Sequence, residues 1–153
     1  MKLSKSNIVL LMILAIALLF FCMVNADQEG FMSLSNNFSG QGKCLDSGPT
    51  GAIMAPCGQY SGQQWSTSPS KLVSQNPALA GKCLDLNGGS PIMAGCAPTP
   101  AQLWTFLPNK RIQNSDPSSK GKCLEIVNDP YRNKLQMNTC SKFAGQIWTT
   151  GLN

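Results

Sequence analysis

The 153-residue sequence contains no histidine. That absence excludes the Ser-His-Asp and Cys-His arrangements of nucleophilic catalysis, together with the usual proton shuttle near neutral pH. The chain also lacks any Cys-x-x-Cys pair, so the common zinc-binding patterns are missing. Charged residues make up only 12% of the chain, and the formal net charge of +5 does not indicate a nucleic-acid partner. We therefore expect a protein that is not an enzyme, holds no metal and uses no cofactor.

Long apolar runs and helical hydrophobic periodicity are both missing after residue 26. Short segments rich in β-branched and aromatic residues lie between clusters of Gly, Pro, Asn and Ser, such as DSGPTG at Asp46–Gly51 and NGGSP at Asn87–Pro91. This pattern is typical of short strands joined by tight turns. The sequence therefore predicts an all-β mature chain.

One apolar run of 17 residues does occur, at 8–24, after two lysines and before the small residue Ala26. The order of charged, apolar and small-residue segments is that of a secretory signal peptide. We expect residues 1–26 to be removed, so that a secreted chain begins at Asp27 and has no contact with a membrane. An uncleaved membrane anchor is the alternative, because 17 apolar residues approach the length that spans a bilayer.

Two landmarks recur along the rest of the chain with the same spacing. Gly-Lys-Cys-Leu followed by an acid occurs at Gly42–Asp46, Gly81–Asp85 and Gly121–Glu125, and Gln-x-Trp occurs at Gln63–Trp65, Gln102–Trp104 and Gln146–Trp148. Their shared period of about 40 residues predicts three copies of one structural unit. Within a single domain at 27–153, we place unit 1 at about 31–70, unit 2 at about 71–109 and unit 3 at about 110–153.

The six cysteines of the mature chain fall two to a unit. An oxidising compartment favours disulfides over metal ligation. Six cysteines allow many connectivities, but nearly identical units are each expected to close their own loop. The predicted bridges are Cys44–Cys57, Cys83–Cys96 and Cys123–Cys140.

The repeated Gln-x-Trp motif has a structural interpretation. Two residues apart on a strand, the glutamine and the tryptophan would share one face. We expect each tryptophan to fill the core and each glutamine to satisfy backbone groups of a neighbouring loop. Three all-β units must also hide their strand edges, and a barrel closed around a pseudo-threefold axis and capped by hairpins does so.

The period, the Gly-Lys-Cys-Leu-Asp/Glu motif, the second cysteine and Gln-x-Trp together resemble the ricin B-type lectin family, from about Phe31 to Asn153. The resemblance implies a β-trefoil and a non-catalytic protein whose partners are glycans, of the galactose type. In that family the acid after Cys-Leu accepts hydrogen bonds from sugar hydroxyls. An aromatic ring two residues before the second cysteine stacks on the sugar, and an Asn just before Gln-x-Trp helps to bind the hydroxyls.

This chain keeps only part of that site. The acids are Asp46, Asp85 and Glu125. The position of the ring holds Ala55, Ala94 and Asn138, and the position of the Asn holds Gly62, Ala101 and Gly145. The candidate sugar-binding residues are Asp46, Gln63, Asp85, Gln102, Glu125, Tyr131, Asn138 and Gln146.

Unit 3 departs least from the family pattern, because the separation of its two cysteines is 17 residues rather than 13. We predict that any sugar binding is concentrated there, with Tyr131 over a pocket bounded by Glu125 and Gln146. Such a site would be weak for a monosaccharide and stronger on multivalent glycans. The acids also have a second interpretation, in which they accept backbone hydrogen bonds in turns.

Two function classes stay open from the sequence. The first is a secreted carbohydrate-binding module, and the second is a secreted β-trefoil that has lost sugar binding and binds a protein as an inhibitor or effector. Because the three acids belong to separate units, we expect them to lie apart rather than to form the carboxylate pair of a glycosidase. The triplet NFS makes Asn37 a candidate glycosylation acceptor.

Overall fold

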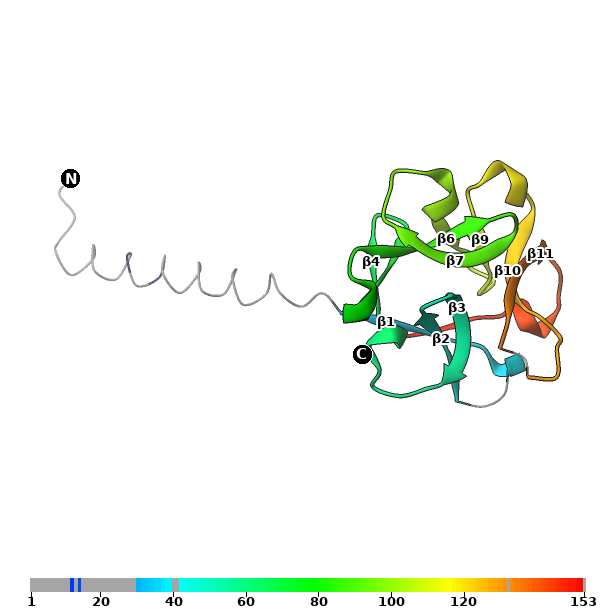
Figure 1. Ribbon diagram of the computed structural model, residues 1–153, viewed down its shortest axis with the longest axis horizontal. Helices are drawn as coiled ribbons and strands as arrows, with labels where there is room; N and C mark the ends of the chain where they lie inside the picture. Colours follow the sequence, from blue (N-terminus) through cyan, green and yellow to red (C-terminus); the bar gives the residue numbers. More distant parts are fainter. Residues whose placement is uncertain (1–11, 13, 15–29, 40–41, 132, 153) are drawn as a thin grey trace. The chain divides into compact units, whose positions relative to one another are not determined.

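The computed structural model describes residues 12, 14, 30–39, 42–131 and 133–152 (Figure 1). The expected signal peptide at 1–26 lies almost wholly outside these residues. The described residues from Phe31 onward belong to one compact unit of twelve strands and six single-turn 3-10 helices. The described segments include no helix with the length and hydropathy needed to cross a bilayer.

Each unit contributes four strands in the same order. Unit 1 holds β1 (Met32–Ser35), β2 (Lys43–Gly48), β3 (Gly51–Pro56) and β4 (Trp65–Ser68). Unit 2 holds β5 (Lys71–Ser74), β6 (Lys82–Asn87), β7 (Ser90–Gly95) and β8 (Trp104–Phe106). Unit 3 holds β9 (Ile112–Asn114), β10 (Lys122–Ile126), β11 (Leu135–Thr139) and β12 (Thr149–Leu152). The 3-10 helices are η1 (Asn37–Ser39), η2 (Ser61–Gln63), η3 (Pro77–Leu79), η4 (Pro100–Gln102), η5 (Pro117–Ser119) and η6 (Ala144–Gln146).

The strand pairing forms a barrel capped by three hairpins (Figure 1). Antiparallel pairs β1–β12, β4–β5 and β8–β9 build the barrel, and β1 also pairs with β4. At the two equivalent seams, the Trp104 amide donates to the Ser70 carbonyl at 2.7 Å and the Trp148 amide donates to the Lys110 carbonyl at 2.8 Å. The cap consists of the hairpins β2–β3, β6–β7 and β10–β11. The fold is a β-trefoil, so the expected architecture is confirmed.

The three repeated tryptophans lie in the core at equivalent places. Trp65, Trp104 and Trp148 are 0%, 1% and 2% exposed. Each indole Nε1 donates to the carbonyl of the leucine in the same unit's Cys-Leu motif, at 3.2 Å to Leu45, 2.9 Å to Leu84 and 3.0 Å to Leu124. The hydrogen bond satisfies the indole N–H while its rings are buried. The expected role of the tryptophans is confirmed.

The glycine and cysteines of the first landmark close each hairpin at its base. Gly42, Gly81 and Gly121 have φ values of 73°, 71° and 73°, a left-handed conformation that disfavours other residues. The carbonyl of each glycine accepts a hydrogen bond from the amide of the second cysteine in its unit. All three predicted disulfides are present, with Cα atoms 5.0 Å apart in each.

The expectation that each Gln-x-Trp motif lies on one strand is wrong. Gln63 ends the 3-10 helix η2, where its amide donates to the Tyr60 carbonyl at 3.0 Å, and the next strand begins only at Trp65. The same break precedes Trp104 and Trp148. The turn is needed because the glutamine side chain bonds back to its own hairpin, whereas the tryptophan enters the core.

Candidate functional site

Each acid that follows Cys-Leu accepts a hydrogen bond from the Gln-x-Trp glutamine of its own unit. The distances from Nε2 to the carboxylate oxygen are 3.0 Å for Gln63 and Asp46, 2.7 Å for Gln102 and Asp85, and 2.6 Å for Gln146 and Glu125. The three glutamines are at most 1% exposed. In each unit, the buried side-chain amide of the glutamine therefore holds one carboxylate oxygen of the candidate sugar-binding acid in place.

The glutamines also hold the loop that follows the second cysteine. In unit 1, Gln63 Oε1 accepts from the Gly58 amide at 2.9 Å and Nε2 donates to the Pro56 carbonyl at 2.8 Å. Units 2 and 3 repeat both bonds with Gln102 and Gln146. The expected role of the glutamines in satisfying loop backbone groups is confirmed.

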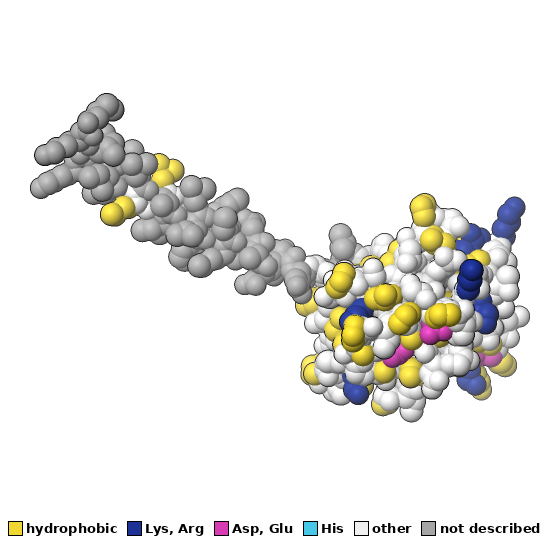
Figure 2. Space-filling model, turned by 90° about the horizontal axis from the view of Figure 1, so that it is seen from above, with side chains coloured by type: hydrophobic (Ala, Val, Ile, Leu, Met, Phe, Trp, Pro, Cys, Tyr) yellow, Lys and Arg dark blue, Asp and Glu magenta, His cyan; other side chains and the backbone are white. Residues whose placement is uncertain are grey.

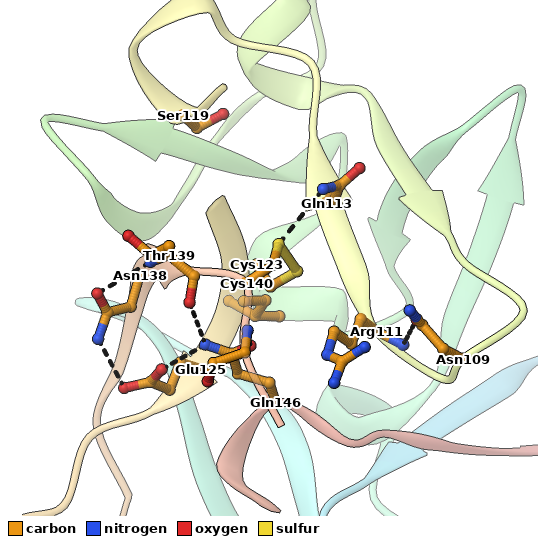
Figure 3. The surroundings of a disulfide bond; sticks show 12 residues. Asn109, Arg111, Gln113, Ser119, Cys123, Glu125, Asn138, Thr139, Cys140 and Gln146 are labelled. Carbon is orange, nitrogen blue, oxygen red and sulfur yellow. Dashed lines mark hydrogen bonds between the residues drawn. A yellow bond between two sulfur atoms is a disulfide. The ribbon is translucent and has the colours of Figure 1, made fainter. Parts of the chain in front are cut away.

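In unit 3, Glu125 accepts hydrogen bonds from side chains of its own unit (Figure 3). Glu125 is only 6% exposed. Its Oε2 accepts from Gln146, and its Oε1 accepts from Asn138 at 3.2 Å and from Gln136 at 3.4 Å. Both carboxylate oxygens therefore bond to side chains of the same unit. Glu125 and Gln146, which were expected to bound a sugar pocket, are both buried and bonded to each other.

Tyr131 itself lies in the connection between β10 and β11 and is 75% exposed. Its carbonyl accepts a hydrogen bond from Lys43 Nζ in unit 1 at 2.9 Å. The last register pair of this hairpin is Ile126 with Leu135, so Tyr131 lies beyond the paired part of the strands. The extra residues of unit 3 form this loop.

A phenylalanine occupies the space beside Gly145, where the family has its Asn. A Cβ atom added to Gly145 would collide with the Phe143 ring. The ring packs edge-to-face on Phe38 of unit 1, with centroids 4.6 Å apart. The Gly145 carbonyl also accepts from Asn36 Nδ2 at 2.9 Å. Phe143 and Gly145 of unit 3 thus contact residues of unit 1.

In unit 2 both oxygens of the acid are also bonded within the protein. Asp85 Oδ1 accepts from the Leu86 amide at 2.6 Å, and Oδ2 accepts from Gln102. The residue paired directly across the hairpin from Asp85 is Ile92, which is half-buried. The stacking position, Ala94, offers no ring. Unit 2 thus places an engaged carboxylate next to a partly covered aliphatic side chain.

Unit 1 differs from the other two because Asp46 keeps one oxygen free. Its Oδ2 accepts from Gln63, whereas Oδ1 accepts no hydrogen bond from the described residues and is not among their fully buried atoms. A Cβ atom added to Gly62 would collide with Oδ1, so the family's Asn does not fit this arrangement. Opposite Asp46 in register lies Ile53, which is 41% exposed.

Sequence reasoning missed Ile53, because residues 52–55 are all apolar and show no alternation of polar and apolar side chains. Along β3 the burial alternates through Ala52, Ile53 and Met54, with the isoleucine outside. Strands place successive side chains on opposite faces, so Ile53 points away from the side on which Ala52 and Met54 are buried. Figure 2 shows one face of the molecule, on which acidic side chains lie next to hydrophobic ones.

Outside the three hairpins, the carboxylate of Asp116 has a structural role. Asp116 caps η5: the Ser118 hydroxyl and amide donate to its Oδ1 at 2.5 Å and 2.8 Å. The hydroxyl bond first, and the amide bond second, lower the pKa of the Asp116 carboxyl below its ordinary value. Across the described ranges, no group of His, Cys, Asp or Glu side chains is arranged to hold a metal ion.

The family model of the ricin-type beta-trefoil lectin domain matches residues 31–148. The chain belongs to the ricin-type β-trefoil lectin family. A search of curated proteins found no match. The trefoil seen here is similar to solved structures at low identity, and this likeness concerns the fold.

Three of these structures illustrate the likeness. The β-trefoil lectin of the Vibrio vulnificus hemolysin/cytolysin, solved with N-acetyl-D-lactosamine bound, has a TM-score of 0.69 at 16% identity, with 82% of this chain and 96% of that chain covered. The C-half of the earthworm R-type lectin, in complex with GalNAc, has a TM-score of 0.63 at 15% identity, covering 81% and 99%. The agglutinin from Abrus precatorius has a TM-score of 0.65 at 20% identity over 81% of this chain. The match covers 48% of the agglutinin chain, so the protein described here spans about half of the agglutinin's length.

Proposed function

We propose that this ricin-type trefoil is a secreted, non-catalytic carbohydrate-binding protein whose principal sugar site is in unit 1. The observation that carries the proposal is Oδ1 of Asp46, which accepts no hydrogen bond from the described residues and belongs to a half-buried side chain paired across the hairpin with the exposed Ile53. A carboxylate that is fixed through one oxygen presents the other as an acceptor for sugar hydroxyls. An aliphatic side chain next to it offers contact to the apolar face of a pyranose.

The same comparison of the units indicates weak binding of single sugars. Asp85 and Glu125 already use both oxygens within the protein. A single site with one free acceptor is expected to bind a monosaccharide in roughly the millimolar range, about −4 kcal/mol. Useful strength then comes from glycans that present many copies of the sugar, through effective concentration. Galactose-type glycans are the first to test, because structural neighbours were solved with N-acetyl-D-lactosamine and GalNAc.

Two features support the absence of catalysis. The chain has no histidine, and the three acids lie in three different hairpins, each bonded to the glutamine of its own unit. Two carboxylates that act on one glycosidic bond face each other across it. Carboxylates that are each engaged separately do not provide such a pair.

Secretion is supported by the three disulfides and by the leader-like order of residues 1–26. We expect secreted material to begin at Asp27. Asn37, which is exposed at the start of η1, is expected to carry a glycan in a eukaryotic host. Intact mass before and after enzymatic deglycosylation tests both expectations, and retention of residue 1 in the membrane fraction would contradict cleavage.

The binding proposal is tested with an immobilised panel of galactose, GalNAc and N-acetyl-lactosamine conjugates. Asp46→Asn keeps an oxygen for Gln63 and replaces the free acceptor by an amide donor, so binding should fall at least about 10-fold. Asp85→Asn is the matched control and should bind like the wild type. Equal loss in both variants would contradict a site confined to unit 1.

Tyr131→Ala tests the sequence-based prediction that sugar binding is concentrated in unit 3. Loss with Tyr131→Ala and persistence with Asp46→Asn would place the site there. The engaged acids of units 2 and 3 also favour a second candidate function, a trefoil that binds a protein. A folded wild type that binds none of a broad glycan panel would support that second function and refute the first.

A further inference from the structure

We propose that Tyr60 supplies the stacking ring of the unit 1 sugar site, in place of the aromatic residue absent at position 55. The inference rests on the proposed function and names a residue that the family pattern does not assign. Tyr60 is 62% exposed, which leaves most of its ring available to a ligand. It comes from the loop after the second cysteine rather than from the hairpin strand that carries Ala55.

Tyr60 is hydrogen-bonded to Gln63, the buried glutamine that also bonds to Asp46. Its carbonyl accepts from the Gln63 amide at 3.0 Å, and it directly precedes η2 in an extended conformation. Its ring packs over Gly58, where an added Cβ atom would collide with it. The Gly58 amide in turn donates to Gln63 Oε1, and Gln63 Nε2 donates to Asp46. The ring and the carboxylate are therefore both positioned by Gln63.

The 3-10 helix η2, which directly follows Tyr60, approaches the acid. Gly62, two residues after Tyr60, lies against Asp46 Oδ1 so closely that a side chain on it would collide. The free acceptor of Asp46 thus borders the segment that begins with Tyr60. Ile53, which is exposed, is paired with Asp46 across the hairpin. A pyranose has an apolar face and an edge of hydroxyls, so an acceptor and an aliphatic side chain on one hairpin, with an exposed ring in the adjoining loop, are groups that suit it.

The equivalent residue of unit 3, Phe143, has a ring that packs within the protein. Phe143 precedes η6 just as Tyr60 precedes η2. Phe143, however, folds over Gly145 and packs edge-to-face on Phe38, and it is only partly exposed. The equivalent residue of unit 2 is Thr99, which has no ring. Among the described residues of the three units, only those of unit 1 combine a mostly exposed ring at this position with a carboxylate oxygen that accepts no hydrogen bond.

The test measures affinity for the best glycoconjugate of the panel with Tyr60→Ala, Tyr60→Phe and the control Tyr131→Ala. Tyr131 is the other tyrosine of the chain and is more exposed, at 75%. Tyr60→Ala should weaken binding about 2- to 10-fold, the range expected for loss of one aromatic contact. Tyr60→Phe should restore it, since the ring is kept, and Tyr131→Ala should bind like the wild type.

Two further measurements separate stacking from a structural role. Because Tyr60 is mostly exposed, Tyr60→Ala should keep the unfolding midpoint of the wild type, whereas Phe143→Ala should lower it through loss of the Phe38 contact. In NMR spectra, added sugar should shift the ring protons of Tyr60 and leave those of Tyr131 unchanged. The two tyrosines are assigned with the Phe variants.

The outcomes distinguish this inference from the proposed function. Wild-type affinity in Tyr60→Ala, combined with loss in Asp46→Asn, would overturn the role of Tyr60 and leave the sugar site of unit 1 in place. Loss in Tyr131→Ala with full binding by Tyr60→Ala would overturn it in favour of unit 3. A folded wild type that binds no glycan of the panel would overturn both.

Discussion

The buried acid of unit 3 should make its glutamine more important for stability than the same glutamine in unit 1. Gln146→Ala and Gln63→Ala remove equivalent side chains, each fully buried and each bonded to an acid, a backbone carbonyl and a backbone amide. The void left in the core is common to both variants. The difference lies in the acid that loses its partner, because Glu125 is 6% exposed whereas Asp46 is only half-buried.

The magnitude follows from that difference. Leaving a buried polar group without its partner costs about 1–3 kcal/mol, and more if the group is charged. Water can replace the lost donor at Asp46, so Gln63→Ala should lower the free energy of unfolding by about 2 kcal/mol. Glu125 keeps only its longer bonds to Asn138 and Gln136, so Gln146→Ala should lower it by about 3–4 kcal/mol.

The assay is equilibrium unfolding in urea with the disulfides intact, followed by fluorescence of the three buried tryptophans. Adding Glu125→Gln to Gln146→Ala should restore part of the loss, because an unpartnered amide costs less than an unpartnered carboxylate. Equal losses for the two single variants, or a larger loss for Gln63→Ala, would refute the reasoning that burial of the acid sets the difference.

Two other predictions concern the loops. The second cysteine is exposed in units 1 and 2, at Cys57 and Cys96, but only partly exposed at Cys140, which also accepts from Gln113 Nε2. A thiol reductant should therefore open the unit 3 bridge last under native conditions, as followed by alkylation and mass spectrometry. The Ser118 bonds lower the pKa of Asp116, so its stabilising contribution is complete above the ordinary value of 3.8 and is lost as the pH falls through the folded-state pKa. The acid limb of the stability curve of Asp116→Ala should therefore be shallower than that of the wild type.

The sequence alone determined the fold, because the residues that specify the fold act locally and recur in each unit. A left-handed Gly42, a disulfide that spans one hairpin and a buried Trp65 each act within a unit, and all three return in every unit. Repetition at one period turns such local signals into a statement about the whole architecture. The connectivity of the disulfides followed for the same reason.

Only the tertiary structure decided which acid is open, because that property depends on residues distant in sequence or on the exact path of the backbone. Asp46 and Glu125 occupy the same place in their motifs, yet Asn138 and Gln136 bond to Glu125 from the partner strand, whereas Ile53 faces Asp46 without a polar atom. Likewise, Phe143 packs against a ring 105 residues earlier in the chain, at position 38, whereas Tyr60 has no ring partner among the described residues. The sequence marks the pseudo-equivalent residues, but burial and hydrogen bonding arise from packing between segments, and packing is what makes equivalent residues differ.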